Sequence, residues 1–150
     1  MRHILRLTAG VVGGYLVLAI VVFASLSAAY AVMGADRAFQ PSTYDVSTLW
    51  MVTMFALNIL AAVAGGWAGA AIGGNRGATL ALAIVVMLVG ILVAAPVLLA
   101  EQEEIPKSRV GDVGMFEAMR DARQPAWVAL LNPWIGAAGV LLGGRLWRNA

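Results

Sequence analysis

Charged residues are gathered into short clusters along the chain, and four long stretches between the clusters contain no Asp, Glu, Lys, Arg or His. A helix of about 20 apolar residues crosses a bilayer, and the first three stretches reach that length. The last is slightly shorter, but we assign all four as spans. The pattern predicts an all-α integral membrane protein in which residues 1–150 form a single four-helix transmembrane domain. The expected spans are 7–33, 49–72, 79–100 and 127–142.

The overall composition agrees with this pattern. Of the 150 residues, 61% are hydrophobic and only 12% are charged. A water-soluble domain of this size needs more charge to cover its surface. The composition therefore excludes a soluble enzyme or a nucleic-acid reader, and a net charge of +2 gives no reason to expect a nucleic-acid partner. The predicted partner is the lipid bilayer.

The first stretch has a second interpretation, as a cleavable signal peptide. Arg2, His3 and Arg6 form a basic start, and residues 29–31 read Ala-Tyr-Ala, the small-x-small form of a cleavage site. The apolar run is longer than the roughly 7–15 residues usual in a signal peptide, which favours a retained helix. Cleavage would leave three spans in the same orientation.

The distribution of basic residues predicts the orientation. Both tails and the turn between the second and third stretches lack acidic residues, whereas the external loops, 34–48 and 101–126, hold five basic and eight acidic residues. Arginine concentrated in short segments marks the cytoplasmic side. We therefore expect both termini to be cytoplasmic, and the Ala-, Val-, Gly- and Leu-rich composition suggests a bacterial inner membrane. The arginines of the tails and turn are Arg2, Arg6, Arg76, Arg145 and Arg148.

The second external loop contains one helical pattern. With Asp112 as a candidate N-cap, apolar residues recur at helical spacing from Met115 to Ala122. This predicts a short amphipathic helix that could lie on the outer membrane surface. A solvated loop over the bundle is the alternative. The acidic run at residues 101–104 is expected to be solvated, with loose cation binding as the other possibility.

The two halves of the chain resemble each other. Residues 16–22 match residues 80–86 at six of seven positions, and Trp67 to Ala71 correspond to Trp134 to Ala138. This order of matches favours a duplicated helical hairpin. Chance similarity between apolar segments is the alternative. The two tryptophans, which lie within the spans, are expected to pack against glycines.

Small residues recur every four positions in three of the spans. Residues four apart share one helix face, and a face of small residues lets another helix approach closely. These faces are expected to pack helices within the bundle, between copies of the chain or against a partner membrane protein. The predicted packing residues are Gly10, Gly14, Gly65, Gly69, Gly73, Gly139 and Gly143.

Most polar residues within the spans fall toward the opposite end from these glycines. Asn58 and Asn132, with Thr53 and Tyr30, are candidates for a shallow outward-facing polar cavity. The alternative is that each asparagine only makes an interhelical hydrogen bond, worth about 1 kcal/mol or less.

Several kinds of chemistry lack the residues that they need. The chain has no cysteine, its single histidine is His3, and no span contains an ionisable side chain of the kind that proton coupling requires. We find no catalytic triad or phosphate-binding loop. We therefore expect no catalytic, cofactor-binding or metal-binding residues, and a protein that is not an enzyme.

Two functions remain open. The first is a non-catalytic structural or accessory role, in which the protein associates with itself or with a larger membrane complex through its Gly- and Ala-rich helix faces. The second is a passive transporter, channel or binding protein for a small polar or lipidic molecule, with the cluster around Asn58 and Asn132 as the site.

Overall fold

The computed structural model describes residues 2–99 and 108–149, so the acidic run at 101–104 lies outside the described residues. Within these ranges the chain is helical, and backbone pairing of the β type is limited to three isolated bridges. Four of the helices are long and apolar enough to cross a membrane, which confirms the predicted all-α membrane fold. The helices are α1 (Arg2–Met33), α2 (Ala35–Ala38), α3 (Thr48–Gly73), α4 (Arg76–Leu99), α5 (Met115–Asp121) and α6 (Ala126–Asn149).

The long helices extend beyond the predicted spans at the end that carries the termini. Helix α1 begins at Arg2 and α6 continues through Arg145 to Asn149. The predicted spans end at the first charged residue, but the helices continue past it. This is possible because a long arginine side chain can reach the headgroup region from a helix that continues. Helix α1 is about 48 Å long, more than a hydrocarbon core of about 30 Å requires, so it must tilt or project.

A tight turn joins α3 to α4. Gly74 ends α3 in the left-handed conformation, with φ 67°, and its N–H donates to the carbonyl of Ala70 at 2.8 Å. The side chain of Asn75 then accepts from the N–H of Ala78 at 2.9 Å and so caps the first turn of α4. Because only two residues separate the helices, α4 must run back antiparallel to α3.

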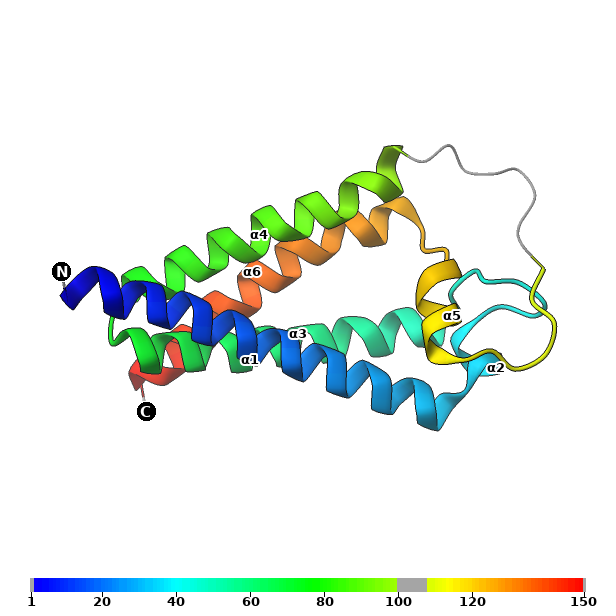
Figure 1. The fold of residues 1–150 in the computed structure, drawn as a ribbon, viewed down its shortest axis with the longest axis horizontal. Helices are drawn as coiled ribbons and strands as arrows, with labels where there is room; N and C mark the ends of the chain where they lie inside the picture. Colours follow the sequence, from blue (N-terminus) through cyan, green and yellow to red (C-terminus); the bar gives the residue numbers. More distant parts are fainter. Residues whose placement is uncertain (1, 100–107, 150) are drawn as a thin grey trace.

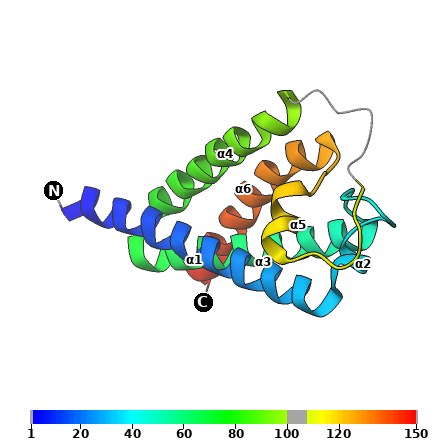
Figure 2. The same ribbon diagram turned by 45° about the vertical axis from the view of Figure 1, so that its right-hand side comes forward.

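The four long helices form two hairpins. Helix α1 packs along α3, α4 packs along α6, and the hairpins meet mainly through α3 and α6. Figure 1 and Figure 2 both show the hairpins close together at the end with the termini and apart at the end with α2 and α5. The order of the helices is the one that a duplicated hairpin requires, and the duplication itself stays a prediction.

Glycines bring α1 and α3 into backbone contact. A Cβ atom on Gly10 would lie 2.8 Å from the carbonyl oxygen of Gly69, and one on Gly14 would lie 2.8 Å from that of Gly65. Gly73 faces Gly10 one turn further along. These distances leave no room for a side chain, so the two helices are as close as their backbones allow.

Helices α3 and α6 meet in the same way. A Cβ atom on Gly66 would overlap the carbonyl group of Val140, and one on Gly143 would overlap the carbonyl group of Val63. Gly139 contacts α3 one turn away from Gly143. All seven glycines singled out in the sequence therefore lie at contacts between helices of this one chain.

The tryptophans of the two similar segments do not pack as predicted. The Trp67 side chain is 49% exposed and that of Trp134 is 66% exposed, so both face outward from the bundle. The prediction that they pack against the glycines was wrong, because at Gly66 and Gly143 the backbone of a neighbouring helix already fills the space. In a bilayer both indole rings would contact lipid.

The two loops at the far end fold into a small apolar cluster, which we call the cap. It joins α2, the segment after it and α5, and Tyr30 and Trp50 pack against it. Helix α5 confirms the predicted short helix, but the residue before its first turn is Gly114 and not Asp112. Asp112 lies two residues too early to cap a helix that starts at Met115. The cap residues are Ala35, Ala38, Phe39, Tyr44, Val46 and Ala118.

We expect Gly143→Ala to destabilise the protein, because the new methyl group would force α6 away from the backbone of α3. Overpacking of this kind costs about 1–3 kcal/mol or more. Thermal unfolding of the purified protein in detergent measures the loss as a lower Tm. Gly136→Ala is the matched control in the same helix, because its methyl group would meet only Cγ1 of Val86, at 2.9 Å. Equal Tm values for the two variants would contradict this account of the contact.

Candidate ligand-binding cleft

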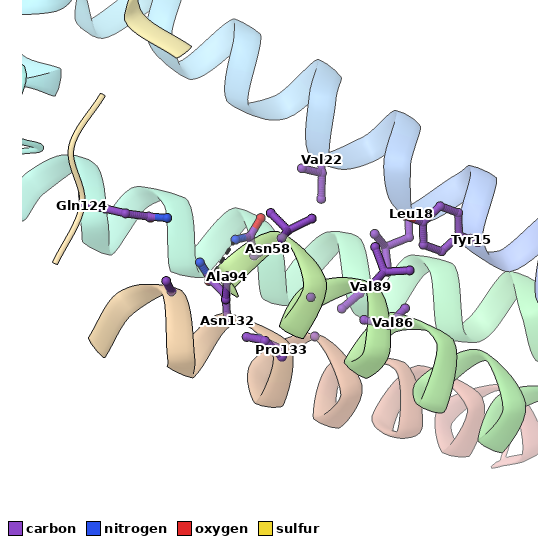
Figure 3. Close-up of a pocket in the computed structure, with 15 residues that line it drawn as sticks. Tyr15, Leu18, Val22, Asn58, Val86, Val89, Ala94, Gln124, Asn132 and Pro133 are labelled. Carbon is purple, nitrogen blue, oxygen red and sulfur yellow. Dashed lines mark hydrogen bonds between the residues drawn. The ribbon is translucent and has the colours of Figure 1, made fainter. Parts of the chain in front are cut away.

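A cavity of about 320 Å³ lies where the two hairpins begin to separate. All four long helices contribute to its wall, and aliphatic side chains of α1 and α4 form one part of it. Figure 3 shows this wall, with Tyr15, Leu18 and Val22 of α1 facing Val86 and Val89 of α4. The cavity is therefore a product of the divergence of the hairpins, and its volume is within the range of about 300–1,000 Å³ typical of small-molecule sites.

Asn58 of α3 and Asn132 of α6 meet in this wall. The Asn58 side-chain nitrogen donates to the Asn132 side-chain oxygen at 3.4 Å, and Figure 3 shows the two side chains pointing toward each other. Both side chains are half-buried. The structure thus brings together the two asparagines that the sequence singled out, 74 residues apart in the chain.

Pro133 has two effects beside this pair. It is buried against Gly90 of α4, where a Cβ atom would lie 2.9 Å from the proline ring. It also lacks an N–H group, so the helical hydrogen bond that would end at the carbonyl of Ala129 is absent. Ala129 is another wall residue of the cavity. The carbonyl group of this residue therefore lacks its usual helical partner, although Ala129 is itself buried.

A second cavity, of about 560 Å³, adjoins the first on the side of the cap. It follows α1 from Tyr15 to Tyr30, and α5 covers it with Met115, Ala118 and Met119. Four residues line both cavities, and we call the two together the cleft. The shared residues are Tyr15, Leu18, Val22 and Gln124.

The cleft is apolar and uncharged over the residues that the structure describes. Its wall contains no Asp, Glu, Lys, Arg or His side chain, and its side chains with polar groups are three amides, two tyrosines and Trp50. One ion pair lies beside the cap, where Arg109 donates to Asp36 at 2.8 Å. Nor do residues 2–99 and 108–149 contain a group of three or more His, Cys, Asp or Glu that could hold a metal ion.

Helix α5, which covers the second cavity and which we call the roof of the cleft, is attached to the rest of the protein by hydrogen bonds. The Tyr44 hydroxyl donates to Glu117 of α5 at 2.6 Å, and the Tyr30 hydroxyl donates to the carbonyl of Val113 at 2.8 Å. Behind α5, the N–H of Arg123 donates to the carbonyl of Tyr44 at 2.9 Å. These bonds hold α5 in place, and Figure 2 shows its position at the end of the bundle.

The other two predicted cavity residues have different positions. Tyr30 lines the second cavity, although its hydroxyl group is used to hold the loop before α5. Thr53 lines neither cavity, and its hydroxyl group donates to the carbonyl of Leu49 in its own helix at 2.9 Å. The hydroxyl of Thr53 is satisfied locally, as is common for threonine in membrane helices.

Sequence reasoning missed several residues of the cleft. Val22 and Gln124 line both cavities, and Met115 and Met119 form part of the roof. A valine in an apolar span has no pattern that separates a cavity wall from a lipid-facing surface. Gln124 could have been noticed in the sequence, because it is an uncharged polar residue two positions before a spanning helix.

Comparisons with protein-family models, with curated proteins and with solved structures found no match. The chemistry of the cleft is therefore the basis for a functional proposal.

The bond between Tyr44 and Glu117 predicts how the roof responds to pH. Donation to the Glu117 carboxylate raises the pKa of the Tyr44 hydroxyl above its ordinary value of about 10, and desolvation acts in the same direction. A raised pKa means that the bond contributes its full stability below about pH 10 and loses it as the pH rises through the folded-state pKa. Tyr44 therefore stays protonated and holds α5 at neutral pH.

We expect Tyr44→Phe to speed amide hydrogen exchange in Met115–Asp121 several-fold at neutral pH, because α5 loses this bond. Hydrogen exchange with mass spectrometry measures the effect. In the wild-type protein, exchange corrected for its intrinsic pH dependence should not change until about pH 10. Tyr15→Phe, which lies outside the cap, is the control. Unchanged exchange in Tyr44→Phe would show that other contacts hold α5.

Proposed function

We propose that this chain is a non-catalytic multi-pass membrane protein that binds one small lipidic molecule in the cleft between its two hairpins. The observation that carries the proposal is an apolar, uncharged cleft within the membrane-spanning part of the molecule, with an asparagine pair in its wall. Pockets for small molecules are mostly apolar, with a few polar groups that fix orientation. An apolar pocket among membrane helices is accessible to molecules already dissolved in the bilayer.

The arrangement of the glycines favours this function over an assembly role. Association with other proteins through glycine faces needs those faces to be free, and the seven predicted glycines contact helices of the same chain. The outer surface of the helices instead presents large side chains such as Leu16, Ile20 and Leu92. Such a surface suits contact with lipid, and nothing in it selects a protein partner.

The proposed location is a bacterial inner membrane with both termini in the cytoplasm. The termini and the α3–α4 turn lie at one end of the bundle (Figure 1), and the arginines there follow the positive-inside rule. In this orientation the cap and α5 lie on the outer side, and the cleft opens within the outer half of the membrane.

Filling the cleft should remove the bound molecule. In Val22→Trp, the indole ring would occupy space that both cavities share. Native mass spectrometry of protein extracted gently from its own membrane should show one lipid-sized adduct on the wild type and little or none on this variant. Ile20→Trp is the matched control, because Ile20 is on the same helix and 65% exposed. An adduct retained equally by both variants would rule out the cleft as the site.

The orientation can be tested with single cysteines, because the natural chain contains none. Val110, 89% exposed beside the cap, and Asn149, exposed at the C-terminus, are suitable positions. A membrane-impermeant maleimide should label Val110→Cys in right-side-out spheroplasts and Asn149→Cys only after lysis. The reverse result would invert the proposed topology and leave the cleft facing the cytoplasm.

A further inference from the structure

We infer that the ligand of the cleft is an uncharged, single-chain amphiphile with a hydroxyl group, and that the hydroxyl binds at Asn58 and Asn132. This inference rests on the proposed function and specifies the class of molecule. It follows from the charge of the wall, the hydrogen-bonding groups that the wall offers and the shape of the two cavities.

The absence of charge in the wall selects a neutral molecule. An ionised group moved from water into an apolar site is costly unless a partner of opposite charge compensates it. Among the described residues, no acidic or basic side chain lines either cavity. A phosphate, sulfonate or carboxylate head would therefore lack a counter-ion here, as would an ammonium group.

The asparagine pair offers both a donor and an acceptor to such a molecule. The bond between the pair uses one N–H of Asn58 and the side-chain oxygen of Asn132. The Asn58 oxygen and the Asn132 amide group remain, and the pair has no further hydrogen bond within the described residues. A ligand hydroxyl can donate to the first and accept from the second.

The Asn58 oxygen favours a hydroxyl over a carbonyl. A hydroxyl can donate to this oxygen while it accepts from the Asn132 amide, whereas a ketone or ester oxygen can only accept. The remaining acceptor of the pair thus favours a ligand that has an O–H group.

The shape of the second cavity suits an alkyl chain. It extends along α1 from Tyr15 to Tyr30, a distance of about 22 Å for a straight helix. Its wall includes Phe23, Leu26 and Met54, with the methionines of α5 at the end. Flexible methionine side chains adapt to apolar ligands of varied length. A chain in this cavity would leave its hydroxyl group near the asparagines of the adjoining one.

The test uses three photoreactive probes of equal chain length: a long-chain primary alcohol, an alkane and an alkyl sulfonate, each with a diazirine in the middle of the chain. The full-length protein is reconstituted in bilayer nanodiscs and irradiated with each probe in turn. Intact-mass spectrometry gives the labelled fraction, and peptide mapping identifies the labelled residues.

We expect the alcohol to label residues of the cleft about fivefold more strongly than the alkane, the gain expected from one net hydrogen bond. The sulfonate should label them least. In the double variant Asn58→Leu with Asn132→Leu, alcohol labelling should fall to the level of the alkane, while alkane labelling stays the same and shows that the cleft is intact. Thr53→Val is the matched control, because its hydroxyl lies outside the cleft.

Each result bears on a specific statement. Equal labelling by alcohol and sulfonate, or alcohol labelling that survives the double variant, would overturn the inference about the ligand while supporting a lipid site. If none of the probes labels the cleft of the wild type, both the inference and the proposed function fail. The comparison of the three probes on the wild type does not depend on whether any variant folds.

Discussion

The close backbone contact of α3 with its two neighbours is the constraint on which the rest of the structure depends. At Gly14 and Gly65 on one side, and at Gly66 and Gly143 on the other, no side chain separates the helices. Contacts this tight can form only where small residues recur, and in this chain they recur toward the end with the termini. Beyond them the hairpins diverge, as Figure 1 shows, and the cleft lies in the region of divergence.

A gap between diverging helices would normally fill with lipid, and here the cap covers its end. The two loops contribute one apolar cluster, and the bonds of Tyr44 and Tyr30 attach α5 and the loop before it to that cluster. Two charged groups beside the cap, Arg109 and Asp36, bind each other. The cleft beneath thus remains apolar although it adjoins a charged region.

The asparagine pair is a small polar feature in this apolar space. A single hydrogen bond between helices stabilises a membrane protein by about 1 kcal/mol or less, so the pair is a weak contributor to the stability of the fold. Its remaining donors and acceptors are more informative, because they lie in a wall that has no charged side chain among the described residues. Together these groups are the basis of the proposed preference for a hydroxyl over an ion.

The sequence by itself determined the membrane fold, the four spans and the glycines of the helix contacts, because hydrophobic length and residue size act locally and leave periodic patterns. It also indicated Asn58 and Asn132 as a possible site. Only the tertiary structure decided that the glycines are used within one chain, that Thr53 lies outside the cleft and that Val22 and Gln124 line it. These outcomes depend on the rotation of each helix about its axis and on where the hairpins separate, and contacts between distant segments fix both.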